Sequence, residues 1–484
     1  MKETESKIVY NSAKPWQIGF FVLNNTATNL YMFAFMFVSY YATGIAGLMV
    51  VTVGTILTMM RIWDGVTDPF IGYLIDRTET RLGKFRPFMA LGNIILAIMA
   101  IIIFQTTHLV PKEWRLLYFI LMYALYIIGY TFQTACTKAA QTVLTNNPKQ
   151  RPLFTLFDSI YNTALFIGGQ MVVSGYLAPK HKGFTQGFFN EFLFYVILVS
   201  AIFTILSIIS IWKKDVKENW GLAKSEKVRF RDFWPVIKNN RPLQMLIISA
   251  STDKLAAVTK TNAVTTVIVY GILMGNYALS GKLQMITVIP TILITFLGIA
   301  YARKLGLKKA YVLSTWIGVI LSFVMFAFLK GIDMKTITLN PLSVNAIIFL
   351  AIFSLIGGVS AVGGNIVIPM IADTVDYETY RSGNYIPGMI STIFSFIDKL
   401  ISSLSTTIIS LLVALIGFKS ELPKVDTPAT TALFWVGMIL FLGLPVLGWV
   451  ASLIAMRFYK LTGTRMHEIQ QALHDKNIER KAAV

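Results

Sequence analysis

The stretch IAGLMVVTVGTILTMMRIWDGVTDPFIGYL, residues 45–74, decides the fold class of this chain. It is mostly apolar and long enough to cross a bilayer as one helix, yet it contains Asp64 and Asp68. Carboxylates inside a membrane helix are costly, so they indicate a functional site by default. Four residues of α-helix amount to about 400° of rotation and roughly 6 Å of rise, which places both carboxylates on one face, one turn apart. The stretch therefore predicts a membrane helix that binds a small cation.

The composition extends this prediction to the whole chain. Of 484 residues, 55% are hydrophobic and 14% are charged, whereas about a quarter of a soluble domain is charged. We predict an all-α, multi-pass membrane protein with twelve transmembrane helices, at about 17–42, 45–74, 87–106, 115–144, 153–178, 190–212, 243–274, 281–302, 310–329, 342–372, 383–417 and 431–458.

The longest polar connection follows the sixth predicted span and divides the chain. The predicted parts are an N-terminal six-helix half (1–212), a cytoplasmic connecting loop (213–242), a C-terminal six-helix half (243–459) and a cytoplasmic tail (460–484).

The net charge of +19 is explained by membrane topology. With an even number of spans, the side of the membrane that holds the N-terminus receives 28 of the 43 Lys and Arg residues. The positive-inside rule then places both termini in the cytoplasm. Contact with anionic lipid headgroups accounts for the basic excess, so we expect membrane lipid and no nucleic acid as a partner.

Two basic connections, 76–86 and 303–309, each follow the second span of a half. Two six-span halves with matching loops indicate the major facilitator fold, in which the substrate binds near the midplane between the halves. A basic loop of this kind can hold helix carboxyl ends and acidic groups in one conformation and release them in another. The alternative is a simple topology signal. The predicted gating residues are Arg61, Arg77, Arg81, Lys84, Asp373, Asp376 and Glu378, and the last three are expected in the connection after the tenth span.

The chain resembles the glycoside-pentoside-hexuronide:cation symporters of the major facilitator superfamily. The resemblance covers essentially the whole chain. It rests on Arg61-Ile62-Trp63-Asp64, Asp68-Pro69, Gly72, Leu82-Gly83-Lys84-Phe85-Arg86-Pro87, Tyr130-Thr131, Ala372-Asp373-Thr374-Val375-Asp376-Tyr377, Lys399 and Arg457-Phe458-Tyr459. It implies a bacterial setting, in the inner or cytoplasmic membrane.

The resemblance also implies a cation site. The family binds sodium, lithium or a proton with paired carboxylates on the second helix and a threonine on the fourth. The matching positions are Asp64, Asp68 and Thr131, with Thr67 nearby. Hard cations prefer oxygen ligands, and a carboxylate pair repels itself until a cation or proton occupies the gap. In the alternative interpretation, Arg61 neutralises Asp64 in a static ion pair.

The substrate positions depart from the family pattern. The family's melibiose carrier binds sugar with aspartates on the first and fourth helices and an arginine on the fifth, but the aligned residues here are Thr28, Thr134 and Ser159. A tryptophan that lies against the sugar aligns with Lys138. Asp158 is a further polar residue, and we expect it to form hydrogen bonds with hydroxyl groups of the substrate.

Basic residues within the spans favour an anionic substrate. Lys138, Lys260 and Lys399 are predicted to converge on a cavity near the midplane, where an unpaired ammonium group is costly and an anion offsets the cost. A uronate-bearing sugar fits the range of the family. In the alternative, Lys254 and Lys399 pair with Asp253 or Asp398, or Lys260 extends to a membrane face.

We therefore predict a monomeric, cation-coupled symporter that imports a sugar or glycoside by alternating access, with no cofactor other than the coupling cation. No catalytic or nucleotide-binding motif indicates an enzyme or an ATP-driven pump. Two alternatives stay open, a cation-coupled carrier of charged amphiphiles such as lysolipids and a non-transporting sensor of the same fold. Retention of Asp64 and Asp68 argues against the sensor.

Overall fold

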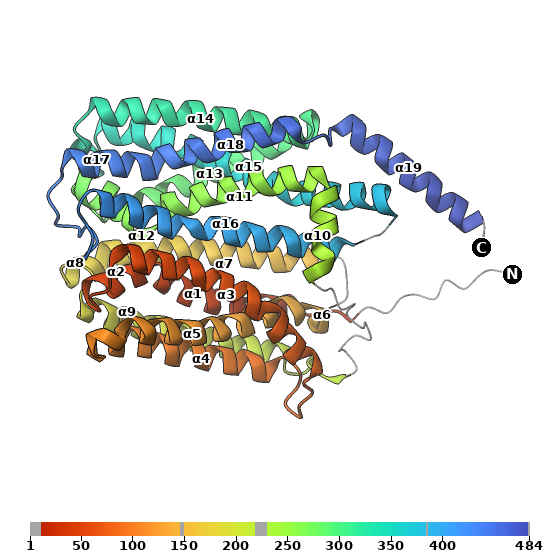
Figure 1. The fold of residues 1–484 in the computed structure, drawn as a ribbon, viewed down its shortest axis with the longest axis horizontal. Helices are drawn as coiled ribbons and strands as arrows, with labels where there is room; N and C mark the ends of the chain where they lie inside the picture. The colour runs from red at the N-terminus through yellow and green to blue at the C-terminus, as the bar shows by residue number, and fades with distance from the viewer. Residues whose placement is uncertain (1–10, 146–149, 218–229, 384–385, 483–484) are drawn as a thin grey trace. The chain divides into compact units, whose positions relative to one another are not determined.

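The computed structural model describes residues 11–145, 150–217, 230–383 and 386–482, and these are predominantly helical (Figure 1). β-structure among these residues is limited to two isolated bridges, Thr80–Gly83 and Leu339–Leu342. The chain divides into two compact units, Met1–Ser225 with Lys419–Leu422 and Glu226–Phe418 with Pro423–Val484.

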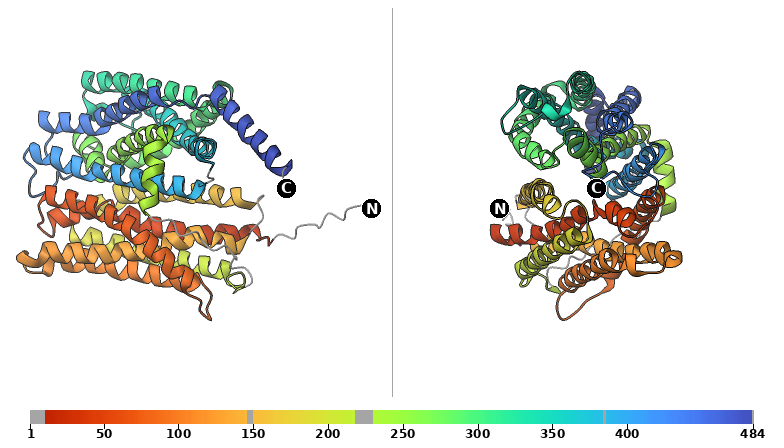
Figure 2. Two further views of the ribbon diagram at one scale, coloured as in Figure 1. Left: turned by 45° about the vertical axis from the view of Figure 1, so that its right-hand side comes forward. Right: turned by 90° about the vertical axis from the view of Figure 1, so that its left-hand side faces the viewer.

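The first unit is a helix bundle, drawn in red to yellow-green in Figures 1 and 2. In it, α1 packs against α7 and α9, α4 against α5 and α9, and α3 against α5. Its elements are α1 (Pro15–Phe35), α2 (Val38–Gly44), α3 (Val50–Arg77), α4 (Arg86–Thr106), η1 (Thr107–Leu109), α5 (Lys112–Ala139), α6 (Gln141–Leu144), α7 (Arg151–Val172), the π-helical η3 (Val173–Leu177), α8 (Ala178–Lys180) and α9 (Gln186–Ile211).

The second unit is also a helix bundle. Here α11 packs against α16 and α18, α13 against α15, and α14 against α15 and α18. Its elements are α10 (Phe230–Asn239), α11 (Arg241–Thr261), α12 (Ala263–Thr266), the π-helical η5 (Val267–Leu273), α13 (Leu279–Leu305), α14 (Leu307–Gly331), η6 (Met334–Thr336), α15 (Val344–Ser382), α16 (Pro387–Leu415), α17 (Thr431–Met438), the π-helical η7 (Ile439–Gly443), α18 (Leu444–Phe458) and α19 (Gly463–Ala482).

Local sequence signals set many of the helix starts. Capping side chains accept a hydrogen bond from a backbone N–H of the first turn at Thr185, Asn240, Ser343 and Thr430. Proline, whose missing N–H costs nothing in a first turn, begins or follows the start of α1, α4, α7, α11, α16 and α18.

Each unit has its own apolar core. In the first, Phe21 of α1, Phe88 of α4 and Phe132 of α5 are buried together with Cys136, the chain's single cysteine. In the second, Leu243, Met370 and Met456 join α11, α15 and α18 in a core that also includes Ile469 of the tail helix α19.

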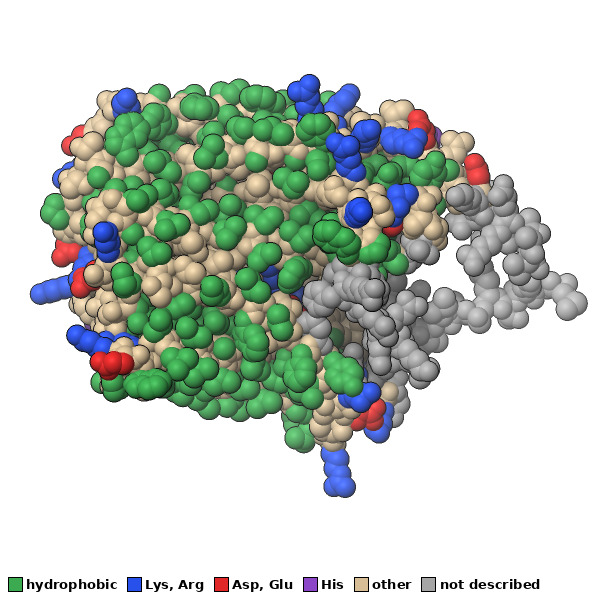
Figure 3. All heavy atoms as spheres, viewed as in Figure 1, with side chains coloured by type: hydrophobic (Ala, Val, Ile, Leu, Met, Phe, Trp, Pro, Cys, Tyr) green, Lys and Arg blue, Asp and Glu red, His purple; other side chains and the backbone are tan. Residues whose placement is uncertain are grey.

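The outer surfaces suit a membrane. Figure 3 shows hydrophobic side chains over most of the visible face, with charged side chains concentrated toward the helix ends. Within the described residues, eight helices are long and apolar enough to cross a membrane, or nine if α11 and the helix that follows it count as one bent span. Helices α1, α3 and α7 are not among the eight. They contain Asn24, Asn25, Asp64, Asp68, Asp158 and Asn162.

A predicted boundary near the end of α15 was wrong, and it affects candidate gating residues. Asp373, Asp376 and Glu378 were expected in a connection, but α15 continues through them to Ser382. The helix ends at Gly383, whose φ of +77° gives the left-handed cap that glycine favours. The acidic residues therefore have fixed helical positions at the end of a long helix.

Candidate cation and substrate site

Three of the four predicted cation ligands come together inside the first unit. Asp64 and Thr67 lie on α3 and Thr131 lies on α5, which packs against α3. The Thr131 hydroxyl lies 3.4 Å from Asp64 Oδ1 and 3.1 Å from the Thr67 hydroxyl. Asp64 is fully buried, and Asp68 is partly buried one turn further along α3. The set supplies carboxylate and hydroxyl oxygens, which are the ligands that alkali cations prefer.

Among the described residues, no group of three or more His, Cys, Asp or Glu side chains is arranged to hold a metal ion. Arg61, one turn before Asp64 on α3, interacts electrostatically with Asp64 and with the phenol groups of Tyr123, Tyr126 and Tyr130 on α5. Arg61 therefore belongs to the surroundings of the candidate cation site.

Polar side chains on two successive helical turns join α1 to α7 in the first unit. Asn25 donates a hydrogen bond of 2.7 Å to Asp158, and Asn29 donates one of 2.7 Å to Asn162. Each pair is partly buried, and the spacing of four residues on both helices keeps the two pairs on one face. This face offers amide and carboxylate groups of the kind that bind sugar hydroxyls.

The other first-unit substrate candidates have local hydrogen bonds or exposed side chains. Thr28 is fully buried, and its hydroxyl donates to the Asn24 carbonyl of its own helix. Thr134 likewise donates to the carbonyl of Thr131. Lys138, near the end of α5, and Ser159, on α7, have exposed side chains.

The candidate lysines of the second unit differ in their surroundings. The Lys260 ammonium, near the end of α11, lies 4.5 Å from the centroid of the Phe353 ring and 5.1 Å from that of Phe441. Among the described residues it has no hydrogen-bonding or ion-pairing partner. Lys254 forms an ion pair with Asp398 of α16, as the alternative interpretation expected for that residue. Lys399 is partly buried on α16.

The loop before α4 is held by an acidic residue that sequence reasoning missed. Asp215, which follows α9, accepts hydrogen bonds of 3.0, 2.9 and 3.1 Å from the backbone N–H groups of Lys84, Phe85 and Arg86. The Arg86 guanidinium lies 3.5 Å from the same carboxylate and stacks over Trp212. The loop is thus fastened to the end of the last helix of its own unit. Asp215 is one of four acidic residues in a basic connection, and its position there gave no signal of this role.

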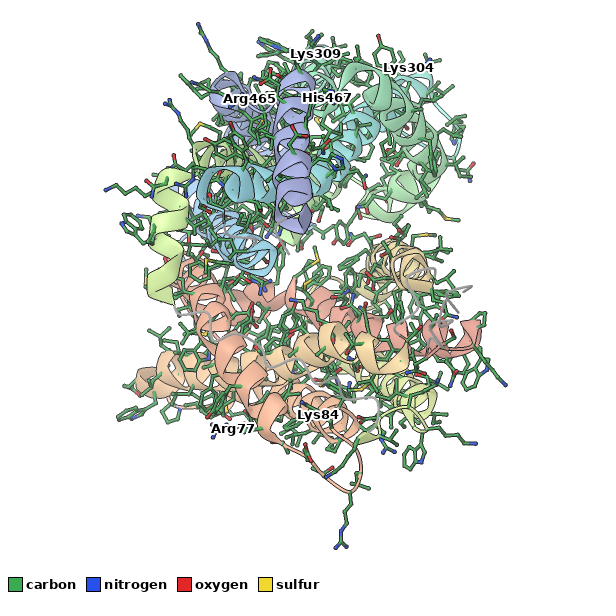
Figure 4. The ribbon with its side chains drawn as sticks, turned by 90° about the vertical axis from the view of Figure 1, so that its right-hand side faces the viewer. Arg77, Lys84, Lys304, Lys309, Arg465 and His467 are labelled. Atoms are coloured by element: carbon green, nitrogen blue, oxygen red, sulfur yellow. The ribbon has the colours of Figure 1, made fainter. Side chains whose placement is uncertain are left out.

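The matching connection of the second unit, predicted at 303–309, is reduced to Gly306 between α13 and α14. Lys308, in the first turn of α14, donates a hydrogen bond of 2.5 Å to the carbonyl of Tyr459, which follows the last residue of α18. A cation at a helix carboxyl end is favourable because the carbonyl groups there lack helical partners. Figure 4 views the helix ends where Arg77 and Lys84 lie in the first unit, and Lys304 and Lys309 in the second.

The remaining gating candidates have local contacts. Arg77 stacks on Tyr73 of its own helix, with its guanidinium carbon 4.6 Å from the ring centroid, and Arg81 is exposed. Glu378 is almost completely buried and is bound by Arg381 of the same helix and by Asn240 at the start of α11. Asp373 and Asp376 are partly buried on the same helix before it.

The two loops provide a prediction with a matched control. Gly83 and Gly306 both have positive φ, +106° and +86°. An added Cβ would lie 2.3 Å from the Asp215 carboxylate at Gly83 but would meet nothing within 4 Å at Gly306. We expect Gly306→Ala to cost about 2 kcal/mol through backbone strain, and Gly83→Ala about 4 kcal/mol because overpacking is added. Thermal unfolding of both purified variants tests this, and equal shifts would contradict the contact with Asp215.

Comparisons with known proteins agree with this architecture. The model of a family described as "MFS/sugar transport protein" matches residues 20–463. The chain is similar to the "Putative glycoside/cation symporter YagG" of Escherichia coli, at 24% identity over 93% of each chain. It is also similar to the "Glucuronide carrier protein homolog" of Escherichia coli, at 24% identity over 93% of this chain and 92% of that one.

A solved structure shows the same fold. The crystal structure of the nucleoside transporter NupG, in a form with one substitution, superposes with a TM-score of 0.63 at 14% identity, over 92% of this chain and all of that one. Since the family model covers most of the sequence, this all-helical, multi-pass membrane protein belongs to the MFS/sugar transport protein family, whose members are transporters and not enzymes.

Proposed function

We propose that this protein is a secondary active symporter that imports a sugar or glycoside by alternating access, coupled to sodium, lithium or a proton bound at Asp64, Asp68, Thr67 and Thr131. One observation carries the proposal. Asp64 is fully buried on α3, and the hydroxyls of Thr67 and Thr131 lie beside it. In a helix that crosses the membrane, as we propose for α3, an uncompensated charge is expensive. The similarity to a protein described as a putative glycoside/cation symporter supports it.

The proposed topology has twelve membrane crossings with both termini in the cytoplasm. Helices α1, α3 and α7 supply crossings beyond the eight or nine that hydropathy identifies among the described residues, because buried polar side chains lower their hydropathy. The proposed parts keep the predicted bounds, 1–212, 213–242, 243–459 and 460–484. We propose a monomer in the cytoplasmic membrane of a bacterium, with the loop before α4 and the acidic end of α15 acting as gating elements.

The proposed substrate is anionic, with a uronate-bearing sugar preferred. Lys260 supports this preference, because its ammonium lies against two aromatic rings and lacks an acidic partner among the described residues. A cation over an aromatic face gains about 0.5 to 2 kcal/mol, which leaves much of the cost of its burial for an anion to offset. A relative described as a glucuronide carrier homolog is consistent with this class. Polar groups such as Asp158, Asn25 and Asn162 would bind sugar hydroxyls.

Ligand-dependent thermal stability tests the function directly. The purified protein is heated with uronates, neutral glycosides or lysolipids, each with sodium, with lithium or with neither, because a ligand that binds the native state raises its apparent stability. We expect a uronate to raise the unfolding temperature, and sodium or lithium to enlarge the increase. A response to lysolipids alone would instead indicate a carrier of amphiphiles. A response to neutral sugars alone would contradict the inference that Lys260 selects an anionic substrate.

Lys260→Gln tests the anionic preference. We expect this variant to lose the thermal response to a uronate and to keep its response to sodium or lithium, because the cation ligands lie in the other unit. The matched control is Lys254→Gln, which removes a lysine that already has Asp398 as its partner. A uronate response that survives Lys260→Gln would exclude this lysine as the group that recognises the anion.

A further inference from the structure

A buried polar cluster in the second unit contains a carboxylate that the proposed cation site does not use. It is formed by Ser249 and Asp253 of α11, Tyr311 of α14 and Ser452 of α18. Tyr311 donates a hydrogen bond to Asp253 Oδ2, and its hydroxyl lies 2.9 Å from those of both Ser249 and Ser452. The two serine hydroxyls also hydrogen-bond to each other. Three helices therefore meet at one carboxylate.

One oxygen of this carboxylate lacks a partner in the part of the chain that the structure describes. Asp253 Oδ1 is buried and makes no hydrogen bond there. The adjacent Lys254 lies on another face of α11 and pairs with Asp398 of α16. The described groups that act on Asp253 are the hydroxyls of Tyr311 and Ser452, and neither carries a positive charge.

The corresponding junction in the first unit is built from neutral groups. There the first, third and sixth spans meet through Asn93 of α4, Ser200 of α9 and the carbonyl of Ala27 in α1. Asn93 donates a hydrogen bond of 2.7 Å to Ser200, which donates one of 3.1 Å to that carbonyl. Neutral groups are therefore sufficient to join three helices at this position in the fold. The acid at the second junction needs a different explanation.

An ionised Asp253 would leave a buried charge with one unsatisfied oxygen, which is strongly unfavourable in a membrane protein. The hydroxyls already bond to one another at short range, so they leave no room for a metal cation among them. A proton removes the charge and occupies no additional space. We propose that Asp253 is a second proton-binding site, which carries its proton on Oδ1 while Oδ2 accepts the hydrogen bond from Tyr311.

Infrared spectroscopy of the lipid-reconstituted protein tests this proposal independently of transport. A protonated carboxyl group has a C=O stretching band that an ionised carboxylate lacks. We expect wild type at neutral pH to show such a band, and the difference spectrum against Asp253→Asn to isolate it. Asp398→Asn is the matched control, because Asp398 is a carboxylate that forms an ion pair with Lys254, and we expect its removal to leave the band unchanged.

Two further measurements, the spectrum of Tyr311→Phe and the response of the wild-type spectrum to sodium, keep the test decisive. Tyr311→Phe removes the hydrogen bond to Oδ2, and we expect it to shift the band without abolishing it, which also covers the case that Asp253→Asn does not fold. A wild-type spectrum that lacks the band, or a band that neither variant changes, would overturn the proposal. A carboxylate signal that responds to sodium in wild type and disappears in Asp253→Asn would also overturn it, since Asp253 would then bind a metal cation.

Discussion

Asp64→Asn is expected to abolish cation-driven accumulation of substrate while leaving the protein folded. The substitution preserves the size of the side chain and removes its charge, so the hydroxyls of Thr67 and Thr131 would face an amide. Losing a charged partner from a buried ionic contact costs about 2 to 5 kcal/mol, which weakens cation affinity by roughly 30-fold or more. Coupling depends on that binding free energy, so accumulation should fall to the level reached without a cation gradient.

Proteoliposomes with an imposed sodium gradient provide the measurement. Asp68→Asn should give the same loss, and Asp426→Asn, which changes an exposed carboxylate in a connection, should accumulate substrate like wild type. Unchanged accumulation in Asp64→Asn would reject the cation site. If Asp64 instead only neutralises Arg61, then Asp64→Asn should lower thermal stability and retain the stabilisation by sodium or lithium.

Asp215→Ala is expected to destabilise the first unit strongly. The carboxylate is fully buried and accepts hydrogen bonds from three consecutive backbone N–H groups of the loop before α4. A buried donor that loses its partner costs about 1 to 3 kcal/mol. Because loop water can replace part of the lost bonding, we expect a total cost of about 3 kcal/mol, or an unfolding temperature lowered by roughly 5 to 10 °C.

The matched control changes an exposed carboxylate of the same loop region. Glu79 forms a surface ion pair of 2.9 Å with Lys217, and this hydrogen bond raises the pKa of Lys217. Exposed ion pairs contribute little to stability, so Glu79→Gln should unfold like wild type. If Asp215→Ala and Glu79→Gln unfold alike, Asp215 does not fasten the loop. If Asp215 fastens the loop, Asp215→Asn, which keeps one acceptor oxygen, should have an unfolding temperature between those of Asp215→Ala and Glu79→Gln.

Features that depend on neighbours along one helix were accessible from the sequence. Hydropathy predicted an all-helical membrane protein, and the family match confirms its class. The spacing of Asp64 and Asp68 placed both on one face of a helix, because helical geometry fixes that relation locally. The predicted spans at 17–42, 45–74 and 153–178 stay predictions, because α1, α3 and α7 contain polar residues and are not among the eight helices that are apolar enough to cross a membrane. The sequence failed at the end of α15, which extends beyond the apolar segment that predicted it.

Relations between helices were decided by tertiary packing. Thr131 was proposed as a ligand only through resemblance, and the packing of α5 on α3 brings its hydroxyl to Asp64. Contacts across 129 to 131 positions of sequence join Asp215 to the loop before α4, and Lys260 meets aromatic rings from two other elements. No local pattern encodes such contacts, because they depend on the rotation and depth at which whole helices pack. The same reason applies to Asp253, whose buried Oδ1, without a partner among the described residues, becomes apparent only where three helices meet.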